Sequence, residues 1–260
     1  MRTMQILKLG GSVITHKDEY FSPHTGNIRR LAGEIAASCS KSLIIVHGAG
    51  SFGHPVAKKH QISDGLKNPE QLIGFSETHQ AMTRLNQIIV DAMLESGVPA
   101  FGISASSMLV SKNGRLVDID LSIIKRCLEI GLIPVMYGDA VLDSEQGFAI
   151  LSGDQLTVRL AIELGAERVI FGSDVDGIFT SNPKLDKNAK LIHSVSLSNN
   201  TADVGDTTFT DVTGGMMGKL TEAEEAIKTG TSVIFLNALA PNRVESALRG
   251  EKVMGTILTL

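Results

Sequence analysis

The sequence of 260 residues predicts an α/β fold, a three-layer αβα sandwich around a mainly parallel sheet with β-hairpin excursions. The first observation behind this prediction is that short apolar runs bounded by Gly or Pro alternate with longer amphipathic stretches, the pattern of successive βαβ units. The second is composition: 43% of the residues are hydrophobic and 20% are charged, which suits one substantial core. We therefore expect one domain over residues 1–260, with an internal boundary near 150–153, where a new set of Gly-rich turns begins.

The individual elements follow from these runs in chain order. Strands are predicted at 4–9, 42–47, 98–103, 132–138, 168–173 and 231–236. Helices are predicted at 28–39, 70–96, 120–130, 154–164, 217–229 and 241–249. Two segments interrupt the alternation, 107–118 with an Asn-Gly pair and 140–149 with a polar Gly-containing loop, and both are expected to be β-hairpins. Residues 180–211, rich in Ser, Asn, Thr and Asp, predict a long surface excursion of a kind that often binds ligands.

Charge and composition argue against several classes of function. The formal net charge of −4 at pH 7 is spread over segments of mixed sign, so no nucleic-acid partner is expected. No apolar run reaches the length of a membrane span and the first strand begins too early for a signal peptide, so we expect no membrane partner and a cytoplasmic location. Cys39 and Cys127 lie in helical patterns without a CxxC spacing and are predicted to be buried free thiols. The His residues form no Cys/His cluster, so no structural zinc is expected.

The first chemical motif, Lys8-Leu9-Gly10-Gly11-Ser12, stands at the end of the first predicted strand. Ligands of open α/β sheets bind at the carboxyl ends of strands, and consecutive glycines let backbone N–H groups approach phosphate oxygens. Lys8 and Lys17 would offset the charge of a polyphosphate. The alternative is a tight turn flanked by two solvated lysines.

The second motif, HGAGSFGH at 47–54, follows the second predicted strand. Gly48, Gly50 and Gly53 satisfy GxGxxG, the pattern of a dinucleotide-binding turn. That kind of site also requires an acidic residue at the end of the next strand, about twenty residues on, where this sequence has a helical pattern. Pro55 moreover stands where a clean helix should continue. We therefore favour a second anion-binding turn, in which His54 donates to a phosphate or carboxylate.

Two further motifs are acidic. Ser152-Gly153-Asp154 opens a predicted helix, and Asp154 is either a plain N-cap or a carboxylate that holds a nearby lysine in place. Asp174 and Asp176 follow another predicted strand, just before a glycine. They are either turn residues or part of a metal site, although the further ligands and the distal Glu of an EF-hand are absent.

The last motif, DVTGGMMGK at 211–219, enters a predicted helix. Its spacing fails as a Walker A loop, because Thr213 stands where a glycine is required and Leu220 follows Lys219. What remains is a Gly-rich helix entry with a lysine in the first turn, which is still an anion site by geometry.

KLGGS, HGAGSFGH, SGD, GSDVDGIF and TGGMMGK resemble, in this order, the motifs of the amino acid kinase superfamily, over nearly the whole chain from Lys8 to Lys219. Within that superfamily, HGAGSFGHPVAKKH is similar to the turn of the isopentenyl phosphate kinases, and the fosfomycin kinases share much of it. The resemblance implies transfer of the γ-phosphate of ATP, with Mg²⁺, to isopentenyl phosphate. It also implies a homodimer, with an N-terminal acceptor-binding lobe over about 1–152 and a C-terminal nucleotide-binding lobe over about 153–260.

The same resemblance assigns roles to individual residues. Lys17 would stabilise the transferring phosphoryl group, His54 would bond the acceptor phosphate and Asp154 would orient the lysines. The catalytic residues would be Lys8, Lys17, His54, Asp154 and Lys219. The ATP site would comprise Lys8, Gly10, Gly11, Ser12, Gly50, Asp174, Phe179, Gly214, Gly218 and Lys219. The acceptor site would comprise Ala49, Gly50, His54 and Gly153. No protein metal site is implied, because Mg²⁺ commonly binds through substrate phosphates and water.

A phosphate monoester is already a nucleophile near neutral pH, which agrees with the lack of an Asp–Ser or His–Asp pair at these turns. An isoprenyl tail needs an apolar pocket, for which 72–75 and the helical residues Met82, Leu85, Ile88 and Ile89 are candidates, with core packing as the alternative. Three other functions stay open. They are a fosfomycin-type phosphonate kinase or another small-molecule kinase of this superfamily, a nucleotide-binding regulator without turnover, and a dinucleotide oxidoreductase.

Overall fold

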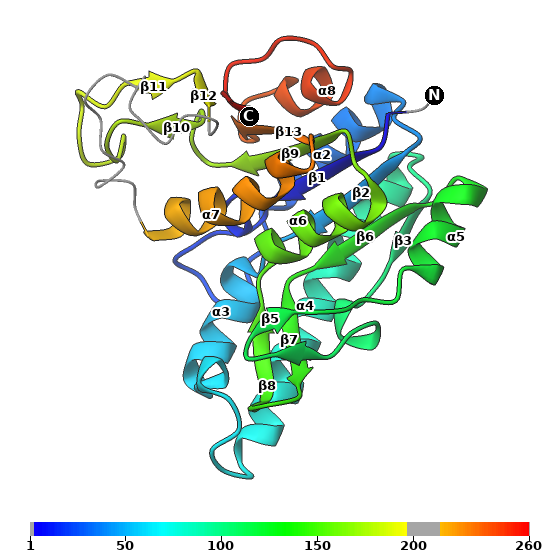
Figure 1. The fold of residues 1–260 in the computed structure, drawn as a ribbon, viewed down its shortest axis with the longest axis vertical. Coiled ribbons are helices and arrows are strands. Elements are labelled where there is room, and N and C mark those ends of the chain that lie inside the picture. Colours follow the sequence, from blue (N-terminus) through cyan, green and yellow to red (C-terminus); the bar gives the residue numbers. More distant parts are fainter. Residues whose placement is uncertain (1–2, 197–213, 260) are drawn as a thin grey trace.

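The structure is a computed structural model and describes residues 3–196 and 214–259. Its central sheet contains β1 (Gln5–Leu9), β2 (Leu43–His47), β3 (Ala100–Gly102), β6 (Ile133–Tyr137), β9 (Arg168–Ser173), β12 (Ser194–Ser196), β13 (Ser232–Asn237) and β14 (Thr256–Thr259). Their order across the sheet is β12-β14-β13-β9-β1-β2-β6-β3 (Figure 1). Only β13 and β14 are antiparallel neighbours among these described strands. The predicted mainly parallel sheet is confirmed.

Helices cover both faces of this sheet, which confirms the three layers. On one face pack α1 (Gly11–Ile14), α2 (Thr25–Ser38), α3 (Gly50–Lys59), α4 (Gln71–Glu95) and α8 (Arg243–Leu248). On the other face pack α5 (Ser122–Ile130), α6 (Gly153–Leu164) and α7 (Gly214–Lys228). Short 3₁₀ helices occur at η1 (Ile62–Asp64) and η2 (Ala105–Ser107). None of the helices within the described ranges is both long and apolar enough to cross a membrane.

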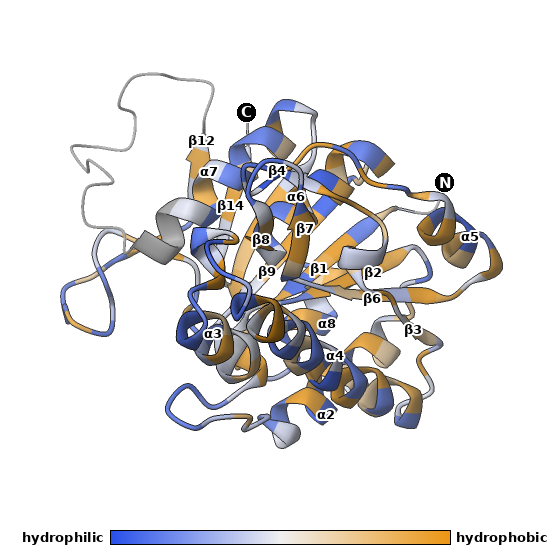
Figure 2. Cartoon of the chain, turned by 90° about the horizontal axis from the view of Figure 1, so that it is seen from below, coloured by the Kyte–Doolittle hydropathy of each residue, from blue (hydrophilic) through white to orange (hydrophobic). Residues whose placement is uncertain are grey.

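The two helical layers explain the composition of the strands between them. Every residue of β1, β2 and β6 is buried, as expected for parallel strands covered on both faces. Along β1 the side chains alternate, so that Ile6 packs in the core beneath α5–α7 and Leu7 in the core beneath α1–α4 and α8. Figure 2 shows the middle strands as mainly hydrophobic and α2–α4 as alternating between hydrophilic and hydrophobic residues.

Both predicted hairpins are present and form a second sheet of order β5-β4-β7-β8. β4 (Ser111–Lys112) and β5 (Arg115–Leu116) are joined by Asn113 and Gly114, with φ of 49° and 72°, the left-handed pair that a tight hairpin requires. β7 (Asp139–Asp143) pairs with β8 (Gly147–Leu151). Of the predicted excursion over 180–211, β11 (Leu191–Ile192) pairs with β10 (Ile178–Phe179) and β12 joins the main sheet. Its remainder, from residue 197, lies outside the described residues.

The two thiols differ in burial. Cys127 on α5 is buried, as predicted, whereas the prediction of a buried Cys39 is wrong. Cys39 caps the end of α2 with a φ of 54°, and it has therefore left the apolar helix face that its sequence pattern suggested. Both cysteines are free thiols.

One carboxylate organises both hairpin turns. The Asp143 side chain is buried. It accepts hydrogen bonds at 2.7 to 3.1 Å from Ser111 Oγ and from the backbone N–H groups of Asn113, Gly114, Glu145 and Gln146. Burial by itself would raise the pKa of Asp143, but these hydrogen bonds to the charged form outweigh it and hold the pKa well below its usual range.

We expect Asp143→Asn to lower the free energy of unfolding by about 2 kcal/mol, because an amide leaves some of these buried N–H donors unpaired. Since the folded-state pKa is depressed, the stabilisation is complete above the unfolded pKa of about 4 and is lost as the pH falls below it. Urea denaturation at pH 7 and pH 3 measures both effects. Asp91→Asn, an exposed carboxylate bonded to Gln87, is the control. Equal losses for both variants would contradict the role of Asp143.

Candidate active site

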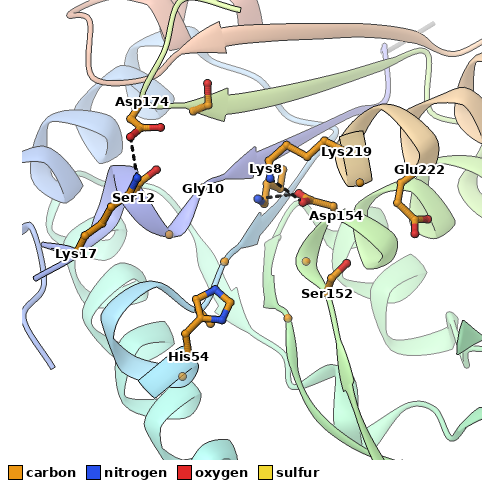
Figure 3. A pocket seen from close by; sticks show the side chains of 18 of the residues that line it. Lys8, Gly10, Ser12, Lys17, His54, Ser152, Asp154, Asp174, Lys219 and Glu222 are labelled. Carbon is orange, nitrogen blue, oxygen red and sulfur yellow. Dashed lines mark hydrogen bonds and ion pairs between the residues drawn. The ribbon is translucent and has the colours of Figure 1, made fainter. Parts of the chain in front are cut away.

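A cleft of about 700 Å³ opens at the carboxyl ends of the central strands β1, β2, β6 and β9. Of the predicted site residues whose surroundings the structure describes, all but Gly50 line it. Figure 3 shows that the labelled lysines, carboxylates and His54 lie around this one cleft, although they come from separate elements. The residues brought together are Lys8, Gly10, Gly11, Ser12, Lys17, Ala49, His54, Gly153, Asp154, Asp174, Phe179, Gly218 and Lys219.

The centre of the cleft is an ion-paired group of two lysines and one carboxylate. Lys8 lies on β1 and is only 5% exposed, and its Nζ is 2.7 Å from Oδ1 of Asp154 on α6. Lys219 on α7 reaches Oδ2 of the same carboxylate at 3.1 Å. Burial lowers the pKa of Lys8, while Asp154 opposes that change. Burial would raise the pKa of Asp154, but the two lysines lower it on balance, so Asp154 is ionised at neutral pH.

The position of Asp154 decides between the two interpretations of its motif. The N-cap of α6 is Ser152, whose Oγ accepts a hydrogen bond from the N–H of Gln155 at 3.0 Å. The interpretation of Asp154 as a plain N-cap is therefore wrong. Because Ser152 caps the helix, the carboxylate two residues later is available to pair with Lys8 and Lys219.

Glycine is required where the strand ends meet, because the backbones there are in contact. A Cβ on Gly11 would lie 2.4 Å from the backbone nitrogen of Gly50, and one on Gly138 would lie 2.6 Å from that of Gly153. Gly50 itself has a φ of 49°, and its Cβ would overlap Thr15 Oγ1 at 2.1 Å. Gly50 thus packs α3 against α1 and does not line the cleft.

A second cationic group closes one side of the cleft. Lys17, in the loop after α1, places Nζ 3.1 Å from Oδ2 of Asp174, and Lys184 pairs with the same oxygen. Burial would raise the pKa of Asp174, but the two lysines lower it to about 2. Asp174, like Asp154, is therefore paired with two lysines. The structure includes no group of three or more His, Cys, Asp or Glu among its described residues that could hold a metal ion, so the metal-site interpretation of Asp174 and Asp176 has no support.

His54 projects from α3 into the cleft, opposite the Lys8 group (Figure 3). The cleft walls partly exclude water from the ring, which lowers the pKa of His54, and the charges of Lys8 and Lys219 lower it further. The expected interruption at Pro55 is wrong, since α3 continues through it to Lys59. The carbonyl that the missing Pro55 N–H would bond has another partner, because Ser51 C=O accepts from Phe21 N–H at 3.2 Å.

Beyond His54 the cleft becomes apolar. Ala57, Met82 and Ile150 line this end together with Thr78. Of the residues proposed for a tail pocket, only Met82 lines the cleft. Leu85 and Ile89 are buried in the main core, and Leu72 and Ile73 are exposed by 51% and 66%.

The motif reasoning missed several cleft residues. Asp139 directly follows the predicted strand 132–138, so the strand-end rule used for the other motifs applies to it as well. Its buried carboxylate accepts from His79 at 2.7 Å; burial raises the pKa of Asp139, and the hydrogen bond to Asp139 raises that of His79. Lys184 and Glu222 also line the cleft, and no local motif marks either of them.

At the entry to α7 the structure covers only part of the predicted motif. The residues up to Thr213 lie outside the described ranges. Gly214 is the first residue of α7, and Gly218 and Lys219 of the same helix line the cleft.

Comparison with known proteins gives a consistent picture. The family model of the amino acid kinase family matches residues 3–237. Isopentenyl phosphate kinase of Methanothermobacter thermautotrophicus is 43% identical over 263 positions, which cover 98% of this chain and 99% of that protein. Isopentenyl phosphate kinase of Arabidopsis thaliana is 31% identical, covering 95% of this chain and 90% of that protein. An X-ray structure of isopentenyl phosphate kinase aligns with a TM-score of 0.88 at 40% identity, covering 98% of this chain and 100% of the other.

We expect Asp154→Asn to destabilise the fold by about 3 kcal/mol, because it leaves the buried Lys8 without a carboxylate partner. Asp174→Asn is the matched control, since Asp174 also pairs with two lysines. The lysines Lys17 and Lys184 are 59% and 52% exposed, so that substitution should cost less than about 1 kcal/mol. Guanidinium denaturation of both variants measures the difference. Equal destabilisation would refute a special role for the buried pair.

Proposed function

The chain belongs to the amino acid kinase family, and from this premise we propose that it transfers the γ-phosphoryl group of ATP to isopentenyl phosphate, giving isopentenyl diphosphate and ADP. The relatives named isopentenyl phosphate kinase, which match nearly the full length, support this acceptor. The observation that carries the proposal is the composition of the cleft. It brings together the cationic side chains of Lys8, Lys17 and Lys219, the ring of His54 and the apolar side chains of Ala57, Met82 and Ile150, the combination that a nucleotide, a phosphate and an alkyl tail require.

Each group in the cleft then has a task in the transfer. An oxygen of the acceptor phosphate forms a bond to the γ-phosphorus, and the bond from that phosphorus to the β-bridging oxygen breaks. Lys8 and Lys219 offset negative charge on the β- and γ-phosphates, and Lys17 stabilises the transferring group. Because the acceptor is already an anion, no side chain has to remove a proton, and catalysis consists of positioning and charge stabilisation.

His54 holds the acceptor phosphate in this proposal. With its pKa lowered by burial and by the charges of Lys8 and Lys219, the ring is mostly neutral at pH 7. A phosphate dianion beside the ring favours the imidazolium form, so acceptor binding raises the pKa of His54 and strengthens the hydrogen bond between them.

Magnesium enters as part of the nucleotide. Asp154 and Asp174 are each paired with two lysines, Asp139 with His79 and Glu222 with Arg115, so every cleft carboxylate in the described part of the chain already has a cationic or imidazole partner. Mg²⁺ held by the ATP phosphates and water fits this arrangement, and it neutralises charge on the phosphates. A homodimer and a cytoplasmic location are further parts of the proposal.

A fosfomycin-type phosphonate kinase is the alternative acceptor class, because its turn motif is shared. The apolar end formed by Ala57, Met82 and Ile150 favours an alkyl tail over a small polar phosphonate. A nucleotide-binding regulator is disfavoured by the presence of Lys8, Lys17, Asp154 and Lys219 together, since binding alone does not need all four.

The first prediction is acceptor preference. In a coupled ADP-release assay with MgATP, we expect isopentenyl phosphate to give the highest kcat/KM in a panel of dimethylallyl phosphate, fosfomycin, acetylglutamate, carbamate and UMP. The reason is that it combines a phosphate for His54 with an alkyl tail for the apolar end, whereas fosfomycin, acetylglutamate, carbamate and UMP do not; dimethylallyl phosphate shares both groups and is expected to rank next. Preference for another panel member would overturn the acceptor, and ADP release with none of them would favour the regulator.

The second prediction concerns His54. His54→Ala should raise the KM for the acceptor by about 10- to 100-fold, the effect of losing a hydrogen bond to a charged group, and leave the KM for ATP within about twofold. Steady-state kinetics with each substrate varied in turn gives both values. His193→Ala, an exposed histidine outside the cleft, is the control. A change confined to the KM for ATP would move His54 to the nucleotide side.

A further inference from the structure

Every backbone and side-chain polar group of Ser51 bonds to the segment that carries Lys17. Ser51 lies near the start of α3, and its N–H donates to Thr15 Oγ1 at 3.0 Å. Its carbonyl accepts from the N–H of Phe21 at 3.2 Å. Its Oγ accepts from the N–H of Ser22 and donates to the carbonyl of Ser22, both at 3.3 Å. Ser51 is 3% exposed, so most of this network is shielded from water.

Pro55 keeps the Ser51 carbonyl available for this network. In a regular α-helix the N–H of residue 55 would bond the carbonyl of residue 51. Proline has no N–H to donate, yet α3 runs on to Lys59. The carbonyl that would be used inside the helix therefore points to the loop and accepts from Phe21.

The loop that Ser51 holds is closed at its base and packed along its side. Thr15 and Pro23 form an antiparallel bridge, and the N–H of His16 donates to the Ser22 carbonyl at 3.0 Å. The ring of Phe21 packs edge-on against Phe52 of α3, with centroids 5.3 Å apart. Lys17 lies between these fixed points, and within the part of the chain that the structure describes its side chain pairs with Asp174.

The same helix carries His54, one turn beyond Ser51. The helix α3 thus positions both groups: it holds the Lys17 loop through Ser51, and it carries His54 itself. Lys17 and His54 both line the cleft. In the proposed reaction these are the groups on the transferring phosphoryl and on the acceptor phosphate. Their spacing matters because a misplacement of about 1 Å can lower a rate by roughly 100-fold.

We propose that Ser51 is a positioning residue that fixes the Lys17 loop against the His54 helix, and that Pro55 serves it by leaving the Ser51 carbonyl free for Phe21. This inference rests on the proposed function. It predicts that loosening the network lowers kcat through Lys17, while the nucleotide and acceptor still bind.

A double-mutant cycle tests this route. Ser51→Ala should lower kcat by about 10-fold, with both KM values within about twofold, because positioning and not binding is lost. In the Lys17→Ala background the same substitution should change kcat by less than about twofold, since the group it positions is absent. Ser96→Ala, which removes a helical hydroxyl far from the cleft, controls for the loss of a serine. An equal fall in kcat in both backgrounds would overturn the proposal.

Pro55→Ala tests the carbonyl without touching the side chain of Ser51. The new N–H competes with Phe21 for the Ser51 carbonyl, so exchange of the Phe21 amide with deuterium should accelerate by about fivefold. The melting temperature should stay or rise, because alanine suits a helix better than proline. If kcat falls while the melting temperature does not, the Ser51 carbonyl acts by positioning the Lys17 loop and not by stabilising the fold in general. Pro69→Ala, before α4, is the control.

The two experiments also separate this inference from the proposed function. If isopentenyl phosphate is not turned over, the function fails, and the exchange rate of the Phe21 amide alone decides whether Ser51 and Pro55 hold the loop. If Pro55→Ala leaves the deuterium exchange rate of the Phe21 amide unchanged, the proposed role of Pro55 and Ser51 in fixing the loop is overturned, whatever the substrate is.

Discussion

A buried positive charge on the central strand is the constraint on which the site depends. Lys8 sits between β2 and β9 in the middle of the sheet, where an unpaired ammonium group would be strongly unfavourable. Asp154 must therefore approach it, which fixes the start of α6, and Ser152 must cap that helix so that the carboxylate is available. The second carboxylate oxygen then holds Lys219 of α7. One carboxylate, through two ion pairs, thus places three elements around the same point.

The floor of the cleft is made of backbone for a related reason. Neighbouring parallel strands end at the same edge of the sheet, so the turns that follow them lie close together. Here these turns contact one another through glycines. Gly11 meets Gly50, and Gly138 meets Gly153, at separations that leave no space for a Cβ. No Cβ stands at these contacts, so a polyphosphate can approach the main chain closely between the lysines.

Much of the fold could be predicted from the sequence, because continuous apolar runs and Gly-bounded turns directly reflect a parallel sheet covered on both faces. The site was less accessible to such reasoning. An Asp at the start of a helix can either cap the helix or pair with a lysine, and the sequence looks the same in both cases. Only the position of Lys8 in space shows that Asp154 is the pairing kind. Pro55 is tolerated inside α3 because a distant N–H, that of Phe21, takes the carbonyl it releases. Hydrophobic periodicity also does not reveal which face of α4 reaches the cleft, so it cannot separate Met82, which lines the cleft, from Leu85, which is buried in the core.

The place of β1 in the sheet has a consequence for synthesis of the chain. One of its neighbours, β2, follows closely in the chain, but the other, β9, is synthesised only after residues 48–167. Until then β1 is an apolar edge strand with unpaired N–H and C=O groups, the kind of surface that pairs with other chains. During this interval Lys8 has no Asp154 beside it, and a charged residue on an unpaired strand is the kind that disfavours pairing with other chains.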